Sequence, residues 1–383
     1  MPKTCLAVAL ALGLGAPACG GPAPPESAVR TFTTKSGATL RVETFVSGLE
    51  VPWSMAFSSP TRLVVTERPG RVRVVANGRL AAAPLAVIGD VEASGESGLM
   101  GTTLAPDYSR THLLYLAYAY DTSKGTRVRV ARYRDDGTAL SERMVLIEGL
   151  PAAQYHAGCR LRFGPDGKLY ITTGDATERA IAQDLKSLGG KTLRLNPDGT
   201  IPADNPFPGS PVYSFGHRNS QGLDWDPRSG LLFETEHGPS GFDGPGGGDE
   251  VNIVEAGKNY GWPIVHHRQT REGLVPPLLE YTPAVAPSGA SFSRGGQLPS
   301  FKGDFFFATL RGERLIRVRL DPADPRRVAE TEELFSGVYG RLRDVVSGPD
   351  GALYVATSNR DGRGRPHSGD DRILRVVETS AVH

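Results

Sequence analysis

Short runs in which apolar and polar residues alternate dominate the chain from about residue 31 onward. This alternation is typical of antiparallel strands with one buried face, and the β-branched and aromatic residues in the runs favour strands as well. Two runs joined by a turn form a unit that occurs six times. The equivalent turns are about 45 to 75 residues apart, which fits a propeller blade with insertions. Each of these turns contains a proline: Pro60, Pro106, Pro165, Pro227, Pro299 or Pro349.

The pattern therefore predicts an all-β fold, a six-bladed β-propeller with four-stranded antiparallel blades, as one domain over residues 31–383. Residues 39–46 form a predicted strand before the first complete unit, and we expect this strand to close the ring by joining the last blade. Helical periodicity is hard to find; residues 180–191 are the best candidate for a short helix, which Gly189 and Gly190 would end. A sandwich or two smaller β domains is the alternative, but six similar units without a linker favour a ring.

The first 18 residues have the features of a secretory signal peptide. Lys3 precedes an apolar run over residues 6–14, and small residues lead to Cys19. The run is too short to span a membrane. Cys19 and the Pro/Gly-rich linker at 19–30 favour a lipoprotein, whereas Pro17 departs from the usual lipoprotein cleavage sequence. We therefore expect a periplasmic or secreted protein, and the sequence leaves open whether Cys19 carries a lipid anchor.

Charge and cysteine content exclude several classes of function. Lys and Arg number 43 against 42 Asp and Glu, so there is no basic field that would attract nucleic acid. Cys5 and Cys19 belong to the leader or its end, which leaves Cys159 without a partner for a disulfide. We expect Cys159 to be a small buried apolar residue rather than a nucleophile.

Polar residues gather in the loops next to the first or second strand of successive units. A propeller brings such loops together at one end of its central channel. Arginines that converge in a buried place need anionic partners, because an unpaired buried charge is costly. Asp224 or Asp344 could neutralise them, and so could a ligand with several carboxylates. The candidates are Glu96, His156, Asp175, Arg218, Asn219, Gly238, Pro239, Arg311, Arg341 and Arg343.

A general base and a metal site are also foreseen. His156 precedes a predicted strand, where a neutral imidazole could accept a proton, although a lone histidine is more often structural. The glycine-rich loop at 244–250 ends in Glu250, and its carbonyl and carboxylate oxygens would suit Ca²⁺. The acidic spacing of an EF-hand is missing, and so is the paired-histidine spacing of a zinc site.

Five longer motifs, in this order, resemble the soluble pyrroloquinoline-quinone (PQQ)-dependent sugar dehydrogenases of the glucose/sorbosone dehydrogenase family, most closely their aldose sugar dehydrogenase branch. The likeness extends from about residue 49 to residue 376. The motifs are GKTLRLNPDGTIPADNPF (190–207), GHRNSQGL (216–223), EHGP (236–239), GDEVNIVEAGKNYGWP (248–263) and RLRDVVSGPDG (341–351).

The resemblance implies a quinoprotein oxidoreductase that converts the anomeric hydroxyl of aldose sugars to a lactone. Hydride would pass to Ca²⁺-bound PQQ in the channel mouth, and an external electron acceptor, a quinone or a cytochrome, would follow. His156 matches the general base of the family. Arg218, Asn219, Arg341 and Arg343 match cofactor contacts, the carbonyls of Gly238 and Pro239 match ligands of the cofactor's Ca²⁺, and Glu250 and Tyr260 match ligands of a second, structural Ca²⁺.

Four positions depart from the glucose-oxidising pattern, so the preferred sugar is not implied. Arg311 stands where lysine is found, Glu96 and Ala176 where glutamine is found, and Tyr155 where aspartate is found. Arg311 and Glu96 remain candidates for cofactor binding. A Ca²⁺-dependent lactonase-type propeller hydrolase and a non-catalytic secreted binding propeller are the alternatives, and neither accounts for the converging arginines.

Overall fold

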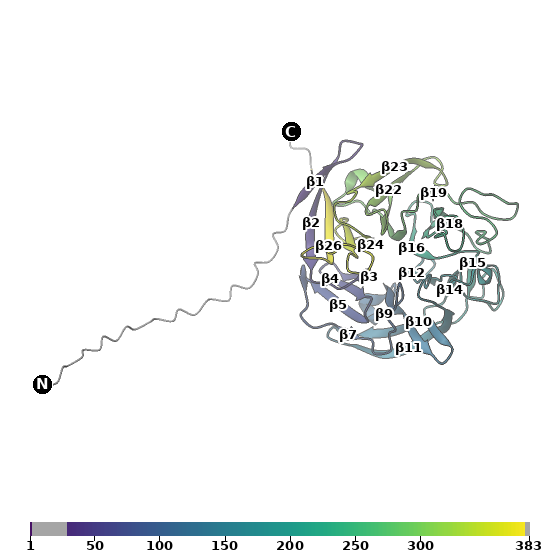
Figure 1. Cartoon of the computed structure of the whole chain (residues 1–383), viewed down its shortest axis with the longest axis horizontal. Helices are drawn as coiled ribbons and strands as arrows, with labels where there is room; N and C mark the ends of the chain where they lie inside the picture. Colours follow the sequence, from purple (N-terminus) through teal and green to yellow (C-terminus); the bar gives the residue numbers. More distant parts are fainter. Residues whose placement is uncertain (2–28, 380–383) are drawn as a thin grey trace.

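The computed structural model describes residue 1 and residues 29–379, and these form six antiparallel sheets arranged around a ring (Figure 1). The predicted leader at 1–18 and Cys19 lie outside the described residues, apart from Met1. Four of the sheets have four strands and two have five. The prediction of a six-bladed antiparallel propeller is confirmed, and four of the six blades have the predicted four strands.

The innermost strand of each sheet contacts the innermost strands of the two neighbouring sheets, so the ring is closed. The loops at the two ends of these six strands surround the central channel. In ring order the innermost strands are β3 (Pro52–Ser59), β8 (Leu99–Leu104), β12 (Leu161–Phe163), β16 (Ser220–Trp225), β20 (Pro287–Phe292) and β24 (Leu342–Ser347).

The remaining strands follow outward from the channel in chain order within each blade, as expected for meandering antiparallel sheets. The blade of β3 continues with β4 (Arg62–Glu67), β5 (Arg71–Ala76), β6 (Arg79–Leu80) and β7 (Ala86–Val87). The blade of β8 continues with β9 (Leu113–Thr122), β10 (Gly125–Asp135) and β11 (Leu140–Pro151). The blade of β12 continues with β13 (Leu169–Thr172), β14 (Lys191–Leu195) and β15 (Val212–Phe215). The next two continue with β17 (Leu232–Glu236), β18 (Asp249–Val254) and β19 (Leu279–Tyr281), and with β21 (Phe305–Thr309), β22 (Leu315–Leu320) and β23 (Val328–Leu334).

The last blade joins the two ends of the described chain. Outside β24 and β25 (Leu353–Thr357) lies β26 (Arg372–Thr379), which pairs with β2 (Thr39–Ser47). The outermost strand is β1 (Arg30–Thr33). The purple β2 and the yellow β26 lie side by side in Figure 1. The predicted ring closure by residues 39–46 is therefore confirmed.

Helical structure within residues 29–379 is limited to three short segments: α1 (Tyr108–Thr111), η1 (Arg179–Ala182) and η2 (Pro299–Phe301). The helix predicted over 180–191 is wrong, because only one 3₁₀ turn forms there. The buried ammonium of Lys191 donates to the carbonyls of Ile181, Ala182 and Gly189 at 2.8, 3.0 and 2.7 Å, and so occupies acceptors that a continuing helix would use. None of these segments is long and apolar enough to cross a membrane.

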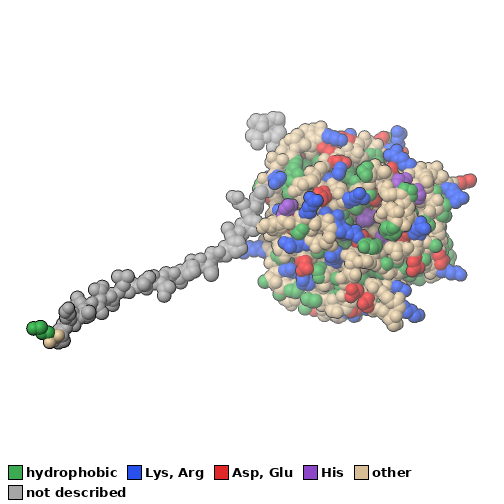
Figure 2. All heavy atoms as spheres, viewed as in Figure 1, with side chains coloured by type: hydrophobic (Ala, Val, Ile, Leu, Met, Phe, Trp, Pro, Cys, Tyr) green, Lys and Arg blue, Asp and Glu red, His purple; other side chains and the backbone are tan. Residues whose placement is uncertain are grey.

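Apolar side chains from adjacent blades pack together between the sheets. Cys159 is fully buried in one of these apolar clusters, and burial raises the pKa of its thiol to about 12. The prediction of a buried, unreactive Cys159 is confirmed. On the face drawn in Figure 2, basic and acidic side chains are interspersed, in keeping with a net charge of +1.

Candidate active site

One end of the ring carries the polar loops that the sequence singled out. Glu96, His156 and Arg218 precede the innermost strands β8, β12 and β16, whereas Pro239 and Arg311 follow the second strands β17 and β21. In an antiparallel blade, the start of the first strand and the end of the second lie at the same edge. Residues from four blades therefore meet at one mouth of the channel.

Most of the predicted residues line one cavity of about 210 Å³ at this mouth: Glu96, His156, Arg218, Gly238, Pro239, Arg311 and Arg341. Arg343 lines a second hollow that shares Glu96 and Arg341 with the cavity. Glu250 and Tyr260 line a third hollow that shares Arg218, Gly238 and Pro239. Asn219 is buried behind these walls.

His156 is paired with a carboxylate from the same blade. Its Nδ1 lies 2.7 Å from Oδ1 of Asp175, and both side chains are buried. Asp175 is fixed in turn by the indole N–H of Trp262 at 2.8 Å and by the backbone N–H of Thr177 at 2.8 Å. The carboxylate holds the imidazole by Nδ1, so Nε2 is left to meet a substrate. The sequence placed Asp175 among the polar candidates at the channel mouth without assigning it a role.

Two of the candidate arginines have acidic partners. Nε of Arg218 donates to Asp243 at 2.7 Å, and Nε of Arg341 donates to Asp361 at 2.8 Å. Asp224 and Asp344, the carboxylates that the sequence offered as one alternative, contact Arg294 at 3.2 Å and Arg160 at 3.1 Å instead.

Arg343 is different, because no carboxylate of the described chain pairs with it. The residue is 6% exposed, and its guanidinium donates only to Gln221 at 3.1 Å and Ser288 at 3.4 Å, while Nε has no partner within residues 29–379. Burial lowers the pKa of Arg343 to about 10; the carboxylates of Asp361 and Glu96 oppose this shift without forming an ion pair, and Arg341 adds to it. A buried cation in this state calls for an anion.

Two further buried polar groups at the mouth lack partners among the described residues. The side-chain amide nitrogen of Asn219 makes no hydrogen bond, although its oxygen accepts from Gln221 at 3.0 Å. Nε2 of His237 is also unpartnered, and burial lowers the pKa of His237 to about 4. Unsatisfied buried groups are rare in proteins and often mark a missing ligand. His237 lines all three hollows, yet within the EHGP motif only its neighbours were chosen as candidates.

Glu96 and Arg311 lie at different depths in the cavity. Glu96 accepts the backbone N–H of His156 at 3.2 Å and pairs with Arg363 at 2.9 Å. Burial acts to raise the pKa of Glu96, but His237, Arg363 and His156 outweigh it and lower the pKa. Arg311 is exposed at the rim, and its side chain makes no ion pair within residues 29–379.

Gly238 has no room for a side chain. A Cβ atom at this position would lie 2.2 Å from the carbonyl oxygen of Gly248 and 2.3 Å from that of Gly247. The loop after β17 therefore runs tightly against the glycine-rich loop before β18. Pro239 accepts the N–H of Gly247 at 3.1 Å, which fixes the direction of its carbonyl.

The third hollow offers hard oxygen atoms, but Tyr260 can contribute only its backbone. Its hydroxyl donates to the carbonyl of Ile253 at 2.6 Å and accepts from the N–H of Glu255 at 2.9 Å, so the hydroxyl is engaged. The carboxyl of Glu250 has a pKa well above its usual value, because of burial and the nearby carboxylate of Glu236. A cation next to Glu250 would relieve this cost.

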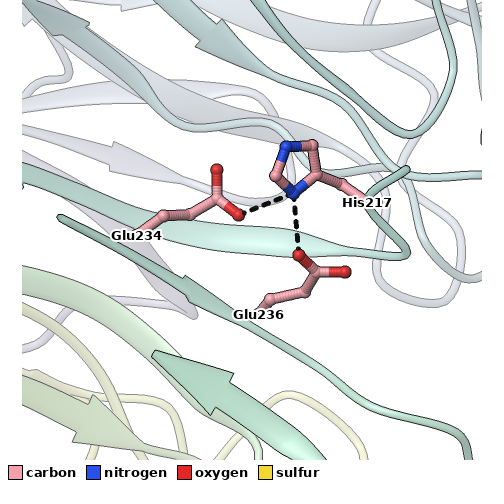
Figure 3. A group of neighbouring side chains, drawn as sticks. All are labelled: His217, Glu234 and Glu236. Carbon is pink, nitrogen blue, oxygen red and sulfur yellow. Dashed lines mark hydrogen bonds and ion pairs between the residues drawn. The ribbon is translucent and has the colours of Figure 1, made fainter. Parts of the chain in front are cut away.

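Behind the hollow lies a buried cluster that supports Arg218 (Figure 3). Nδ1 of His217 lies 2.9 Å from Glu236 and 3.1 Å from Glu234, while its Nε2 contacts the hydroxyl of Ser214 at 2.8 Å. Burial opposes the charge on His217, but the two carboxylates outweigh burial and raise its pKa to about 10. Glu236 also accepts the backbone N–H of Arg218. Both nitrogens of His217 are thus used inside the protein.

Fold and site together define a propeller enzyme with a His–Asp pair beside a cation-rich cavity. The profile of the glucose/sorbosone dehydrogenase family matches residues 49–374 of the chain. The chain belongs to this family of oxidoreductases.

Two relatives are similar over most of their length. The aldose sugar dehydrogenase YliI of Escherichia coli K12 is 33% identical over 349 residues, which cover 85% of this chain and 92% of the relative. The PQQ-bound structure of an aldose sugar dehydrogenase from Streptomyces coelicolor is 35% identical, has a TM-score of 0.79, and the match covers 93% of this chain and 99% of that one.

Proposed function

We propose that this protein oxidises the anomeric hydroxyl of aldose sugars to lactones, with PQQ and Ca²⁺ as cofactors and His156 as the general base. The observation that carries the proposal is the buried guanidinium of Arg343, which has no carboxylate partner in residues 29–379 and lies beside the cavity that holds the His156–Asp175 pair. PQQ is an anion with several carboxylates. Such an anion would satisfy this arginine.

The residues at the mouth suit the quinone in charge and in hydrogen bonding. Arg343, Arg341 and Arg311 would hold its carboxylates, and the planar guanidinium group favours two-point contacts. The unpartnered amide nitrogen of Asn219 would donate to its oxygens. Nη1 and Nη2 of Arg218 already donate to the carbonyl of His237 at 3.1 Å and the hydroxyl of Ser240 at 3.0 Å, and the second N–H of each would donate to the quinone. The PQQ-bound structure of the Streptomyces coelicolor relative supports PQQ as the cofactor.

Calcium ions would take oxygen ligands from the two neighbouring loops. The carbonyls of Gly238 and Pro239 are the proposed ligands of the ion at the cofactor, and Glu250 with the backbone carbonyl of Tyr260 those of a second, structural ion. The raised pKa of Glu250 supports the second ion, because a carboxyl group placed there without a cation resists ionisation.

The chain's own part in the reaction is to position the sugar and to move one proton. Nε2 of His156 would accept the proton of the anomeric hydroxyl, since Nδ1 is held by Asp175 at 2.7 Å. The Asp175 carboxylate would stabilise the imidazolium that results. PQQ with Ca²⁺ supplies the two-electron acceptor that these side chains lack. The alternative, a lactonase-type hydrolase, would need carboxylates as ligands of its Ca²⁺. Asp243 and Asp361 are not available for this role, because they pair with Arg218 and Arg341.

We further propose that the leader at residues 1–18 exports the protein to the periplasm or the medium, either free or anchored through Cys19. The reduced enzyme would pass its electrons to an external quinone or cytochrome. Both proposals rest on the sequence.

Reconstitution tests the proposed function. The protein without cofactor is mixed with Ca²⁺ and PQQ, and reduction of a dye is followed on addition of aldoses. We expect aldose-dependent reduction, and Arg341→Ala should weaken quinone binding while His156→Ala preserves it. The absence of both a bound-quinone spectrum and dye reduction would overturn the proposal.

A further inference from the structure

A second cavity, of about 600 Å³ and distinct from the three hollows described above, adjoins the catalytic one. Its wall is built by the loop between β23 and β24 and by the loop between β25 and β26. Arg363 lines both cavities, so a ligand that extends past this side chain would enter the second cavity. The quinone, the calcium ions and the aldose of the proposed function all bind outside this second cavity.

Tyr339 forms a buried polar wall of the second cavity. The residue is 7% exposed, and its hydroxyl has no hydrogen-bond partner within residues 29–379. The guanidinium of Arg372 lies 5.9 Å from the Tyr339 ring, and its Nε is likewise buried without a partner. These two donors beside the cavity have no acceptor among residues 29–379, and a polar ligand would supply one.

The charge of the lining favours an anionic ligand. Arg363, Arg365 and Arg372 face a single acidic lining residue, Glu313. Two of the arginines have carboxylate neighbours outside the lining: Glu96 is 2.9 Å from Arg363, and Asp370 is 3.4 Å from Arg372. Arg365 makes no ion pair with any residue of the described chain. Its planar guanidinium is suited to a carboxylate.

We propose that the second cavity is an extension subsite that binds an acidic sugar ring, such as a uronate, linked to the aldose at His156. The inference deepens the proposed function and rests on it. The shared wall at Arg363 supplies the route from one ring to the next, and the volume admits a sugar ring. The carboxylate would be bound by Arg365 and Arg372, and a ring hydroxyl by Tyr339.

Binding without turnover is the first test. Methyl β-glucuronoside and methyl β-glucoside lack a free anomeric hydroxyl, so neither can be oxidised, and their binding to the reconstituted enzyme is measured by calorimetry. We expect the glucuronoside to bind about tenfold more tightly, which is the value of one charge-assisted contact. Arg365→Gln should remove this preference, and Arg79→Gln, an exposed arginine on another blade, should retain it.

Equal affinity for the two glycosides would overturn the inference, and so would an unchanged preference in Arg365→Gln. Inorganic phosphate is the third ligand. If it binds as tightly as the glucuronoside, the cavity is a general anion site and the saccharide assignment is wrong.

Turnover then separates the subsite from the proposed function. Glucuronosyl-glucose should have a KM about tenfold below that of the neutral disaccharide cellobiose, and Arg365→Gln should bring the two KM values together. Failure to oxidise any aldose would refute the proposed function, and the binding test would still decide the subsite. Oxidation of both disaccharides with equal KM would refute the subsite alone.

Discussion

Nδ1 of His156 lies 2.7 Å from Oδ1 of Asp175, and the Asp175 carboxylate is itself held by the indole of Trp262. The pair therefore has one orientation, in which Nε2 of His156 is the nitrogen free to exchange a proton with substrate. Base and cofactor contacts come from different blades, because Arg218 and Asn219 precede β16 and Arg341 and Arg343 lie at the start of β24. Proton transfer and quinone binding should consequently respond to different mutations.

His156→Ala should remove turnover and leave quinone binding intact. General bases contribute about 10²- to 10⁴-fold to a rate, so kcat should fall by at least about 100-fold. The dissociation constant of PQQ, measured by titration of its absorbance, should change by less than about threefold. A variant that loses binding and turnover in parallel would show that His156 holds the cofactor instead.

Asp175→Asn should lower kcat by more than about 100-fold and up to about 10⁴-fold, the loss found when a His–Asp pair loses its charge and the imidazole takes the wrong tautomer. The amide keeps the size of the side chain and can still accept from Trp262, but its NH₂ group then faces Nδ1 of His156, so the imidazole proton lies on Nε2 and that nitrogen can no longer accept one. KM for the sugar and the quinone affinity should stay close to those of the wild type. If kcat is unchanged, the pair does not take part in the reaction.

Arg343→Met should weaken PQQ binding more than tenfold without destabilising the protein that lacks cofactor. The guanidinium is buried with no carboxylate partner, so its removal relieves a desolvation cost in exchange for weak contacts to Gln221 and Ser288. Thermal unfolding without PQQ measures the stability of the cofactor-free protein, and absorbance titration measures its affinity for PQQ. Arg79→Met is the matched control. Lower stability with unchanged quinone affinity would mean that Arg343 is structural.

Chelation of Ca²⁺ should lower the unfolding temperature of the wild type. At a free Ca²⁺ concentration 100 times the dissociation constant, the bound ion would stabilise the fold by about 2.7 kcal/mol. Glu250→Gln should show a much smaller shift on chelation, because the carboxylate is a proposed ligand. Glu272→Gln, an exposed carboxylate in a nearby loop, is the control and should behave as the wild type. An equal shift in all three proteins would remove Glu250 from the site.

The fold could be predicted from local patterns because propeller blades are built from neighbouring strands. Alternation and turn prolines gave the six units, and the extra strand at 39–46 was enough to predict how the ring closes. The segment 180–191 was misassigned because its periodicity is helical, whereas the side chain of Lys191 binds the carbonyls on which a helix would depend. That contact is tertiary, and no local pattern shows it.

The candidate site was predicted as a set of residues but not as a set of pairs. Asp243 and Asp361, the partners of Arg218 and Arg341, stand in loops with no strand pattern to place them. Arg363 was missed for the same reason, because it lies in a glycine-rich loop where no strand pattern places it. Tyr260 was found through its motif, yet only the structure reveals that its hydroxyl is engaged with Ile253 and Glu255.

The central claim is that the anomeric hydroxyl of an aldose is oxidised at the PQQ site. The most direct measurement is a single-turnover experiment on the protein reconstituted with Ca²⁺ and PQQ, in which the quinone absorbance is followed without a dye after glucose or methyl β-glucoside is added. The account predicts a spectral change with glucose, formation of the lactone, and no change with the methyl glycoside. An equal change with both sugars, or none with any aldose tried, would contradict it.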